Sequence, residues 1–115
     1  MHAVGKIEKL KDIKGERGTV VKAARVENRE NGHSKFYEVA LEEMPDTTYV
    51  IRTFWGAIGC KKPGTQVKHA ADSVVDALAV FHDWLIEKTQ GKICSQHGVI
   101  EQYKDHGAEP RFAKK

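Results

Sequence analysis

The stretch TYVIRTFWGAIG, residues 48–59, decides the fold expected for this chain, because large apolar side chains fall on both faces of an extended segment. One face carries Tyr49, Ile51, Thr53 and Trp55, and the other carries Val50, Arg52 and Phe54. The alternation predicts a strand from Thr48 to about Trp55. Either both faces of this strand are covered, or a bulge near Gly56 changes its phase.

Patterns upstream and downstream of this stretch predict three further strands. Residues 35–42, KFYEVALE, alternate cleanly between two faces. A Val-rich run at residues 20–26 precedes them, and the turn signal Asn31-Gly32 lies between the two runs. Residues 65–69 predict a short fourth strand, which follows a basic loop bracketed by glycines.

One long helix is predicted from about Ser73 to Gln90. Ser73 suits the N-cap, Asp76 places an acidic group in the first turn, and Gly91 is typical of a helix end. Six apolar side chains share one arc of roughly 120°, which must face the sheet. They are Val74, Ala77, Leu78, Phe81, Trp84 and Leu85.

A second stripe on the same helix consists of Val75, Ala79, His82 and Ile86. One explanation is that the C-terminal part of the chain covers it, with Ile93, Val99 and Ile100 as candidates. The other explanation is a surface that contacts a partner protein or a second copy of the chain.

Length, charge and cysteine content narrow the class of protein. A chain of 115 residues fits one domain, and a net charge of +3 is compatible with nucleic-acid binding without arguing for it alone. The two cysteines predict a reducing compartment rather than a disulfide framework. Neither a membrane span nor a signal peptide is expected, so we expect the cytoplasm, or the nucleus in a eukaryote.

Neither a metal site nor a catalytic site is expected. Cys94 and His97 have the spacing of one ligand pair, but a structural zinc site usually has two such pairs. No phosphate-binding glycine loop occurs, and nothing beside Cys60 or Cys94 marks an activated nucleophile. We therefore expect a protein that is not an enzyme and has no cofactor.

Charge is distributed unevenly, since no acidic residue lies between Asp46 and Asp72. Basic and aromatic side chains interleave in this window, as in proteins that neutralise phosphates and stack on bases. A solvated basic loop beside core aromatic residues explains the same pattern. The side chains concerned are Arg52, Lys61, Lys62 and Lys68, with Tyr49, Phe54 and Trp55.

These segments, in this order, resemble the WGR domain, a family named for a Trp-Gly-Arg motif. The resemblance rests on KFYEVALEE, a Pro/Asp turn, TYVIRTFWGAIG, and SVVDALAVFHDWLIEKTQGKI. Trp55-Gly56 and Ile58-Gly59 match the motif frame, and Glu87-Lys88-Thr89 resembles the end of the family's helix. The resemblance covers about residues 19–93, leaving an N-terminal lead-in at 1–18 and a C-terminal tail at 94–115, whose last part we expect to be loose.

The resemblance implies an α+β fold, with an antiparallel sheet of about four strands and one long helix packed across it. In poly(ADP-ribose) polymerases such a domain contacts DNA at a break, and bacterial proteins also carry it. The family's Trp stacks on a nucleotide, and the resemblance implies that Trp55 takes this role by its position in the motif. The motif Arg is replaced by Ala57, and Phe54 stands where Arg often precedes the Trp. Loss of such an Arg contact costs about 1–3 kcal/mol.

Two functions remain open. The first is a nucleic-acid-binding module for DNA ends or single strands, in which Trp55 stacks and Gly56 permits close approach, with DNA favoured over RNA. The second is a protein-interaction or dimerisation module that has lost DNA binding. Its apolar motif surface would include Phe54 and Ala57, and its partner surface would be Val75, Ala79 and Ile86. The cations expected to meet phosphates in the first function are Arg52, Lys61, Lys62, Lys68 and Lys35.

Overall fold

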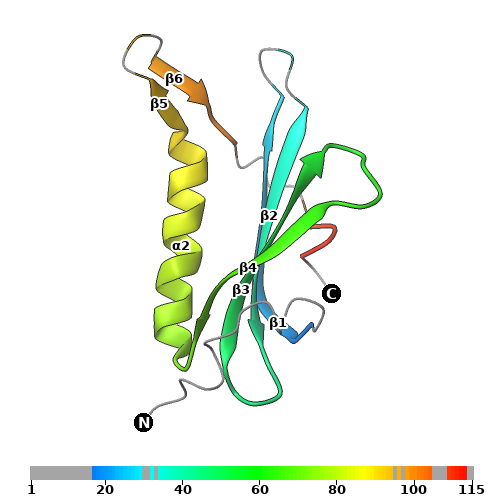
Figure 1. Ribbon diagram of the computed structural model, residues 1–115, viewed down its shortest axis with the longest axis vertical. Coiled ribbons are helices and arrows are strands. Elements are labelled where there is room, and N and C mark those ends of the chain that lie inside the picture. The colour runs from blue at the N-terminus through cyan, green and yellow to red at the C-terminus, as the bar shows by residue number, and fades with distance from the viewer. Residues whose placement is uncertain are drawn as a thin grey trace.

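A computed structural model describes residues 17–29, 32, 34–94, 96, 98–104 and 109–113 (Figure 1). Its main sheet is antiparallel in the order β1-β2-β3-β4, and a small hairpin, β5-β6, follows the helix α2. The α+β fold with a four-stranded antiparallel sheet and one packed helix is therefore confirmed. The elements are β1 (Thr19–Asn28), β2 (Lys35–Glu43), β3 (Tyr49–Ala57), β4 (Gly64–Ala71), α2 (Val74–Gln90), β5 (Lys92–Cys94) and β6 (Gly98–Glu101).

The front face of the sheet is the face that α2 covers. Its core consists of Val39, Leu41 and Ile51 from the sheet with Ala77 and Phe81 from the helix. The helix begins as predicted, because the Ser73 hydroxyl accepts the backbone N–H of Val75 at 3.2 Å. It ends at Gly91, whose φ of 82° favours glycine and whose N–H donates to the Glu87 carbonyl.

The back face of the sheet is also covered, here by residues 109–113 of the C-terminal segment. In Figure 1 this segment (red) lies on the side of the sheet opposite α2. Phe112 stacks against Phe36 and Phe54, and Ala113 is fully buried beside them. The expectation of a loose tail is wrong for these five residues. Lys114 and Lys115 lie outside the described part of the chain.

The apolar residues on both faces of β3 are explained by coverage of both faces. This is the first of the two alternatives predicted from the sequence, the other being a bulge near Gly56. The register does shift, but beside Ile51 and Arg52, where Lys68 is the extra residue on β4. No bulge is needed near Gly56, since its register with Phe36 is regular. The large groups of β3 therefore belong to separate clusters: Ile51 packs under α2 on the front face, while on the other face Phe54 packs with Phe112 and Val50 packs with Met44 and Val67.

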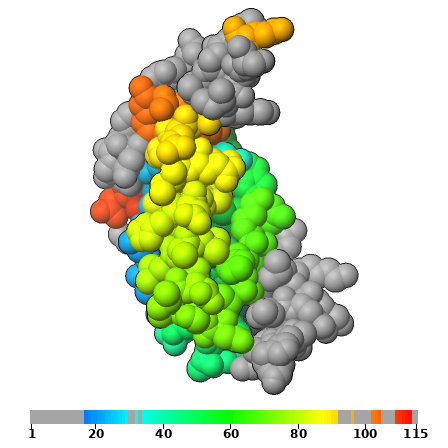
Figure 2. Space-filling model, turned by 90° about the vertical axis from the view of Figure 1, so that its left-hand side faces the viewer, coloured from blue at the N-terminus to red at the C-terminus, as the bar shows by residue number. Residues whose placement is uncertain are grey.

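The second stripe of α2 stays at the surface. Val75 is 70% exposed and Ile86 is 50% exposed, while residues 109–113 pack on the far side of the sheet. Figure 2 shows α2 (yellow-green to yellow) running along this side of the molecule, with the green strands next to it. The side chains of Ile93, Val99 and Ile100, proposed to cover the stripe, lie outside the described residues.

Candidate nucleic-acid interface

Four aromatic side chains gather on the front face near the C-terminal end of α2, and we call them the aromatic cluster. Antiparallel register places Tyr37 on β2 directly opposite Trp55 on β3, with ring centroids 6.2 Å apart. The ring of Tyr37 also meets Trp84 edge-on at 5.4 Å and Tyr103 edge-on at 5.1 Å. These separations suit attractive aromatic contacts, and Tyr37 lies at the centre of the cluster because it contacts each of the other three rings.

Backbone hydrogen bonds hold Tyr103 in this cluster. Its N–H donates to the carbonyl of Lys88 at 3.0 Å, which ties it to the last turns of α2. The next residue, Lys104, exchanges two backbone hydrogen bonds with Glu27 on β1, at 2.8 and 3.0 Å. The C-terminal part of the chain thus joins the helix to the edge of the sheet, and Tyr103 closes one side of the cluster.

A lysine lies within the aromatic cluster. The Nζ of Lys88 is 4.2 Å from the ring centroid of Tyr37 and 5.7 Å from that of Trp84. Both distances allow cation–π attraction, and the last turn of a helix also favours a positive charge. A cation is therefore held beside partly buried aromatic rings, an arrangement that suits a ligand with both phosphate and flat bases.

Two hollows adjoin the cluster and share Tyr37, Trp55 and Lys88 in their walls. The first, of about 430 Å³, extends towards Lys35 and the β1–β2 connection. The second, of about 280 Å³, extends over β4 towards Lys68. Each hollow thus has a lysine at its outer end and shares Lys88 at the centre. Further lining residues are Ser34, Gly56, Ala57 and Tyr103 in the first hollow, and Gln66, Trp84 and Glu87 in the second.

Glycines on β3 and β4 set the position of Trp55. A Cβ atom added to Gly64 would lie 2.5 Å from the Trp55 indole, so β4 can pass the ring only without a side chain there. At Gly56 an added Cβ would meet the Cys60 sulfur at 2.9 Å. The tight turn after the motif therefore gives one reason for Gly56, whereas close approach of a ligand remains a prediction.

Not every predicted cation is available to a ligand. Lys35 and Lys68 line the two hollows, and Lys61 and Lys62 are exposed in the β3–β4 loop but line neither. Arg52 is only 1% exposed, and its Nε lies 3.2 and 3.3 Å from the carboxylate oxygens of Glu42. The expectation that Arg52 meets a phosphate is therefore corrected: its side chain forms an ion pair inside the protein.

The apolar residues of the motif region lie on different faces. Phe54 is buried on the back face and stacks with Phe112, so it does not make the motif surface more apolar. Ala57 is exposed at the rim of the first hollow, where the family motif has Arg. Of the two substitutions, only that at Ala57 changes the surface around Trp55.

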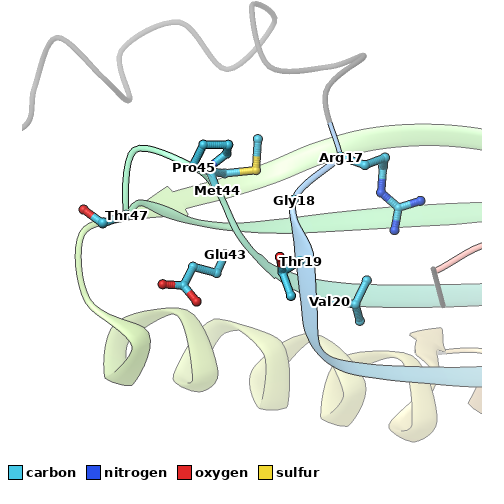
Figure 3. A pocket seen from close by; sticks show the side chains of 8 residues that line it. All are labelled: Arg17, Gly18, Thr19, Val20, Glu43, Met44, Pro45 and Thr47. Atoms are coloured by element: carbon cyan, nitrogen blue, oxygen red, sulfur yellow. The ribbon is translucent and has the colours of Figure 1, made fainter.

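A third hollow, of about 640 Å³, lies at the other end of the sheet, between the start of β1 and the β2–β3 turn (Figure 3). Figure 3 shows Arg17 pointing away from Pro45 and Thr47, towards the back face, where it pairs with Glu42. Among the described residues that line this hollow, none is aromatic. It therefore lacks the combination of rings and available cations found around Trp55.

The residues that the structure describes contain no group of three or more His, Cys, Asp or Glu side chains that could hold a metal ion. The Cys94 side chain and His97 lie outside those residues. In the same described ranges, no helix has the length and apolar character needed to cross a membrane.

Several cluster residues were not predicted as site residues from the sequence. Trp84 was assigned to the sheet-facing arc, and Lys88 only to the helix end. The two are four residues apart, a spacing that places them on one side of a helix. Tyr37 follows from the register of β2 with β3, which a single strand pattern does not reveal. Nothing local in the sequence predicts that Tyr103 folds back onto them.

Comparison with protein families agrees with these features. The model of the WGR domain matches residues 22–93, which span most of β1 and continue through α2 into β5. Within that range lie Trp55, Tyr37, Trp84 and Lys88, whereas Tyr103 and the segment at 109–113 lie beyond it. No curated protein and no solved structure matches the chain.

Proposed function

Because the chain belongs to the WGR family, whose domain is of a nucleic-acid-binding type, we propose that it binds DNA ends or single strands without catalysing a reaction. The observation that carries this proposal is the position of Lys88 in the aromatic cluster, 4.2 Å from the Tyr37 ring, between two hollows that Trp55 also lines. DNA rather than RNA is favoured by the family alone.

The geometry suits flat bases on a charged backbone. Stacking of a base on an aromatic side chain contributes about 1–3 kcal/mol, and each lysine that neutralises a phosphate adds a salt-dependent contribution. Lys35 and Lys68 stand at the outer ends of the two hollows, and Lys88 stands between them. A nucleic-acid strand that lies across both hollows would thus contact these three lysines and the indole of Trp55.

Replacement of the motif Arg by Ala57 lowers the expected affinity. A guanidinium forms paired hydrogen bonds in a fixed plane, which a lysine does not reproduce. The loss is worth about 1–3 kcal/mol in a typical contact, so binding should persist but be weak. Lys61 and Lys62 are exposed near the motif and extend the basic surface along the β3–β4 loop.

The test is fluorescence anisotropy with labelled single-stranded, nicked and blunt-ended DNA at two salt concentrations. Trp55→Ala should weaken binding by about tenfold, or about 1.4 kcal/mol, because the stacking surface is removed. Val75→Ala, on the exposed helix stripe, is the matched control and should leave the affinity unchanged. A titration with RNA of the same sequence shows whether the chain binds DNA more tightly than RNA. Absence of binding at low salt by the folded, unchanged chain would contradict the proposal.

A protein-interaction module is the second candidate, and the exposure of Val75 and Ile86 on α2 favours it. Such a surface would bury these side chains against a partner or a second copy. Light scattering over a wide range of protein concentration tests the dimeric form. A mass that stays at one chain throughout would exclude dimerisation through this stripe in that range.

A further inference from the structure

The back face of the sheet holds residues 109–113 mainly through their backbone. The Glu38 carboxylate is fully buried and accepts three successive backbone N–H groups, from Arg111 at 2.9 Å and from Phe112 and Ala113 at 2.7 Å each. Hydrogen bonds to a charged acceptor are about twice as strong as neutral ones. One carboxylate therefore fixes the path of three residues.

Arg17 binds the carbonyl groups of the same segment, whereas Glu38 binds its N–H groups. Its two terminal nitrogens donate to the carbonyls of Phe112 at 3.2 Å and Ala113 at 2.9 Å. Its Nε is held by Glu42 at 2.6 Å, so the guanidinium is oriented before the segment arrives. Glu38 and Arg17 together bind both the donors and the acceptors of a short peptide.

One side chain of the segment is bound in a defined slot. The Phe112 ring stacks on Phe36 at 5.5 Å and on Phe54 at 6.4 Å, with interplanar angles of 21° and 28°. The following Ala113 is fully buried in the same cluster, so a larger residue there would have to displace its neighbours. The back face thus selects an aromatic residue followed by a small one.

The site does not depend on the segment to satisfy its buried charges. Arg25 donates to Glu38 at 2.6 Å, and Arg52 lies 3.2 Å from Glu42, so both carboxylates keep a cation when the segment leaves. Water can then take the places of the backbone N–H groups. The segment also lies beyond residues 22–93, which make up the matched family domain. Arg17 lies just before that range, so the domain together with Arg17 resembles a receptor, and the segment resembles its tethered ligand.

We infer that the back face is a peptide-binding site, formed by Glu38, Arg17 and the Phe36–Phe54 slot, which accepts an Arg-Phe-Ala segment in exchangeable form. The chain's own residues 109–113 occupy it, and release of this segment would open the back face to a peptide of the same sequence while the aromatic cluster stays on the front face.

The test uses the full-length chain with Phe112→Ala, which weakens its own segment, and a labelled peptide of sequence GAEPRFAKK, residues 107–115. The peptide should bind this variant about tenfold more tightly than the unchanged chain, because the tethered segment competes at high effective concentration. A peptide with Ala in place of Phe is the matched control and should bind at least about tenfold more weakly. Equal binding of the two peptides to the folded variant would overturn the inference.

Hydrogen exchange of the unchanged chain decides the question if the variant does not fold. The amides of Arg111, Phe112 and Ala113 should exchange at least about tenfold faster than that of Val39 in the sheet, through local opening of the segment. Exchange of all four amides at one common rate, set by global unfolding, would mean that the segment is an integral part of the core and would overturn the inference.

Discussion

Two basic residues whose environments differ show how the residue type alone can mislead. Arg52 and Lys88 both carry a positive charge. The stretch without acidic residues between Asp46 and Asp72 predicted a phosphate contact for Arg52. The structure places Arg52 against the buried carboxylate of Glu42 and Lys88 over the ring of Tyr37 beside two hollows. Alternation correctly assigned Arg52 to the face of β3 that carries Phe54. This face is buried because residues 109–113, which lie far along the chain, pack against it.

Arg52→Ala should therefore affect stability more than binding. It leaves the buried Glu42 with Arg17 and the Gly18 N–H as its remaining partners, so we expect a loss of about 3 kcal/mol in the free energy of unfolding. Urea denaturation measures this loss. The exposed Lys61→Ala is the control and should change stability by less than about 0.5 kcal/mol. A variant as stable as the unchanged chain would show that the ion pair contributes nothing.

Lys88→Ala should weaken nucleic-acid binding and reduce its dependence on salt. If Lys88 neutralises one phosphate, the slope of log affinity against log salt should fall by about one unit. Lys22→Ala is the matched control, because Lys22 lies near His82 on the part of the sheet away from both hollows. Equal slopes for the two variants would show that Lys88 does not meet a phosphate.

At the scale of elements, the sequence predicted the four strands of the main sheet and the helix, because each has a local signal, but not the hairpin β5-β6. Period-two alternation marks β2 and β3, and Ser73 and Gly91 cap α2. The C-terminal segment has no such signal. Its position depends on three N–H groups that bind Glu38, a contact about 75 residues away in sequence. The aromatic cluster likewise has no local signal. Its prediction requires the register of β2 with β3, which places Tyr37 beside Trp55, and the packing of α2, which adds Trp84 and Lys88.

Gly64→Ala tests how β4 positions the motif Trp. The added Cβ would lie 2.5 Å from the indole of Trp55, so the ring must move. We expect a stability loss of about 1–3 kcal/mol, together with a shift in Trp fluorescence and weaker DNA binding. The neighbouring Thr65→Val is the control, because its buried hydroxyl makes no hydrogen bond within the described residues. If Gly64→Ala bound DNA as well as the control, the position of the indole would be unimportant.

At the scale of the whole molecule, stability should depend on pH through Glu27. Burial raises the pKa of this carboxyl, but the hydrogen bonds and the charge attraction of Arg25 and Arg29 together outweigh burial and hold the pKa below its usual value. A lowered pKa in the folded state contributes stability above the unfolded pKa of about 4.3, and this contribution is lost as pH falls through the folded pKa.

Glu27→Gln should therefore reduce stability at pH 7 and reduce it less at low pH. Urea denaturation from pH 7 down to about pH 3 measures the difference between variant and unchanged chain. Glu43→Gln, at an exposed position on β2, is the control and should leave the pH profile unchanged. A constant difference between Glu27→Gln and the unchanged chain at all pH values would contradict the assignment.

Each outer strand of the sheet departs from a free and regular edge at one position. The backbone of Lys104 occupies hydrogen-bonding groups of Glu27 on β1, and the extra residue Lys68 disrupts the regular ladder on β4. Exposed edges that are flat and regular template the addition of strands from other molecules, which leads to fibres. The return of the chain at Tyr103 and Lys104 therefore does more than position an aromatic ring: it also occupies one place on the β1 edge where a strand from another molecule would pair.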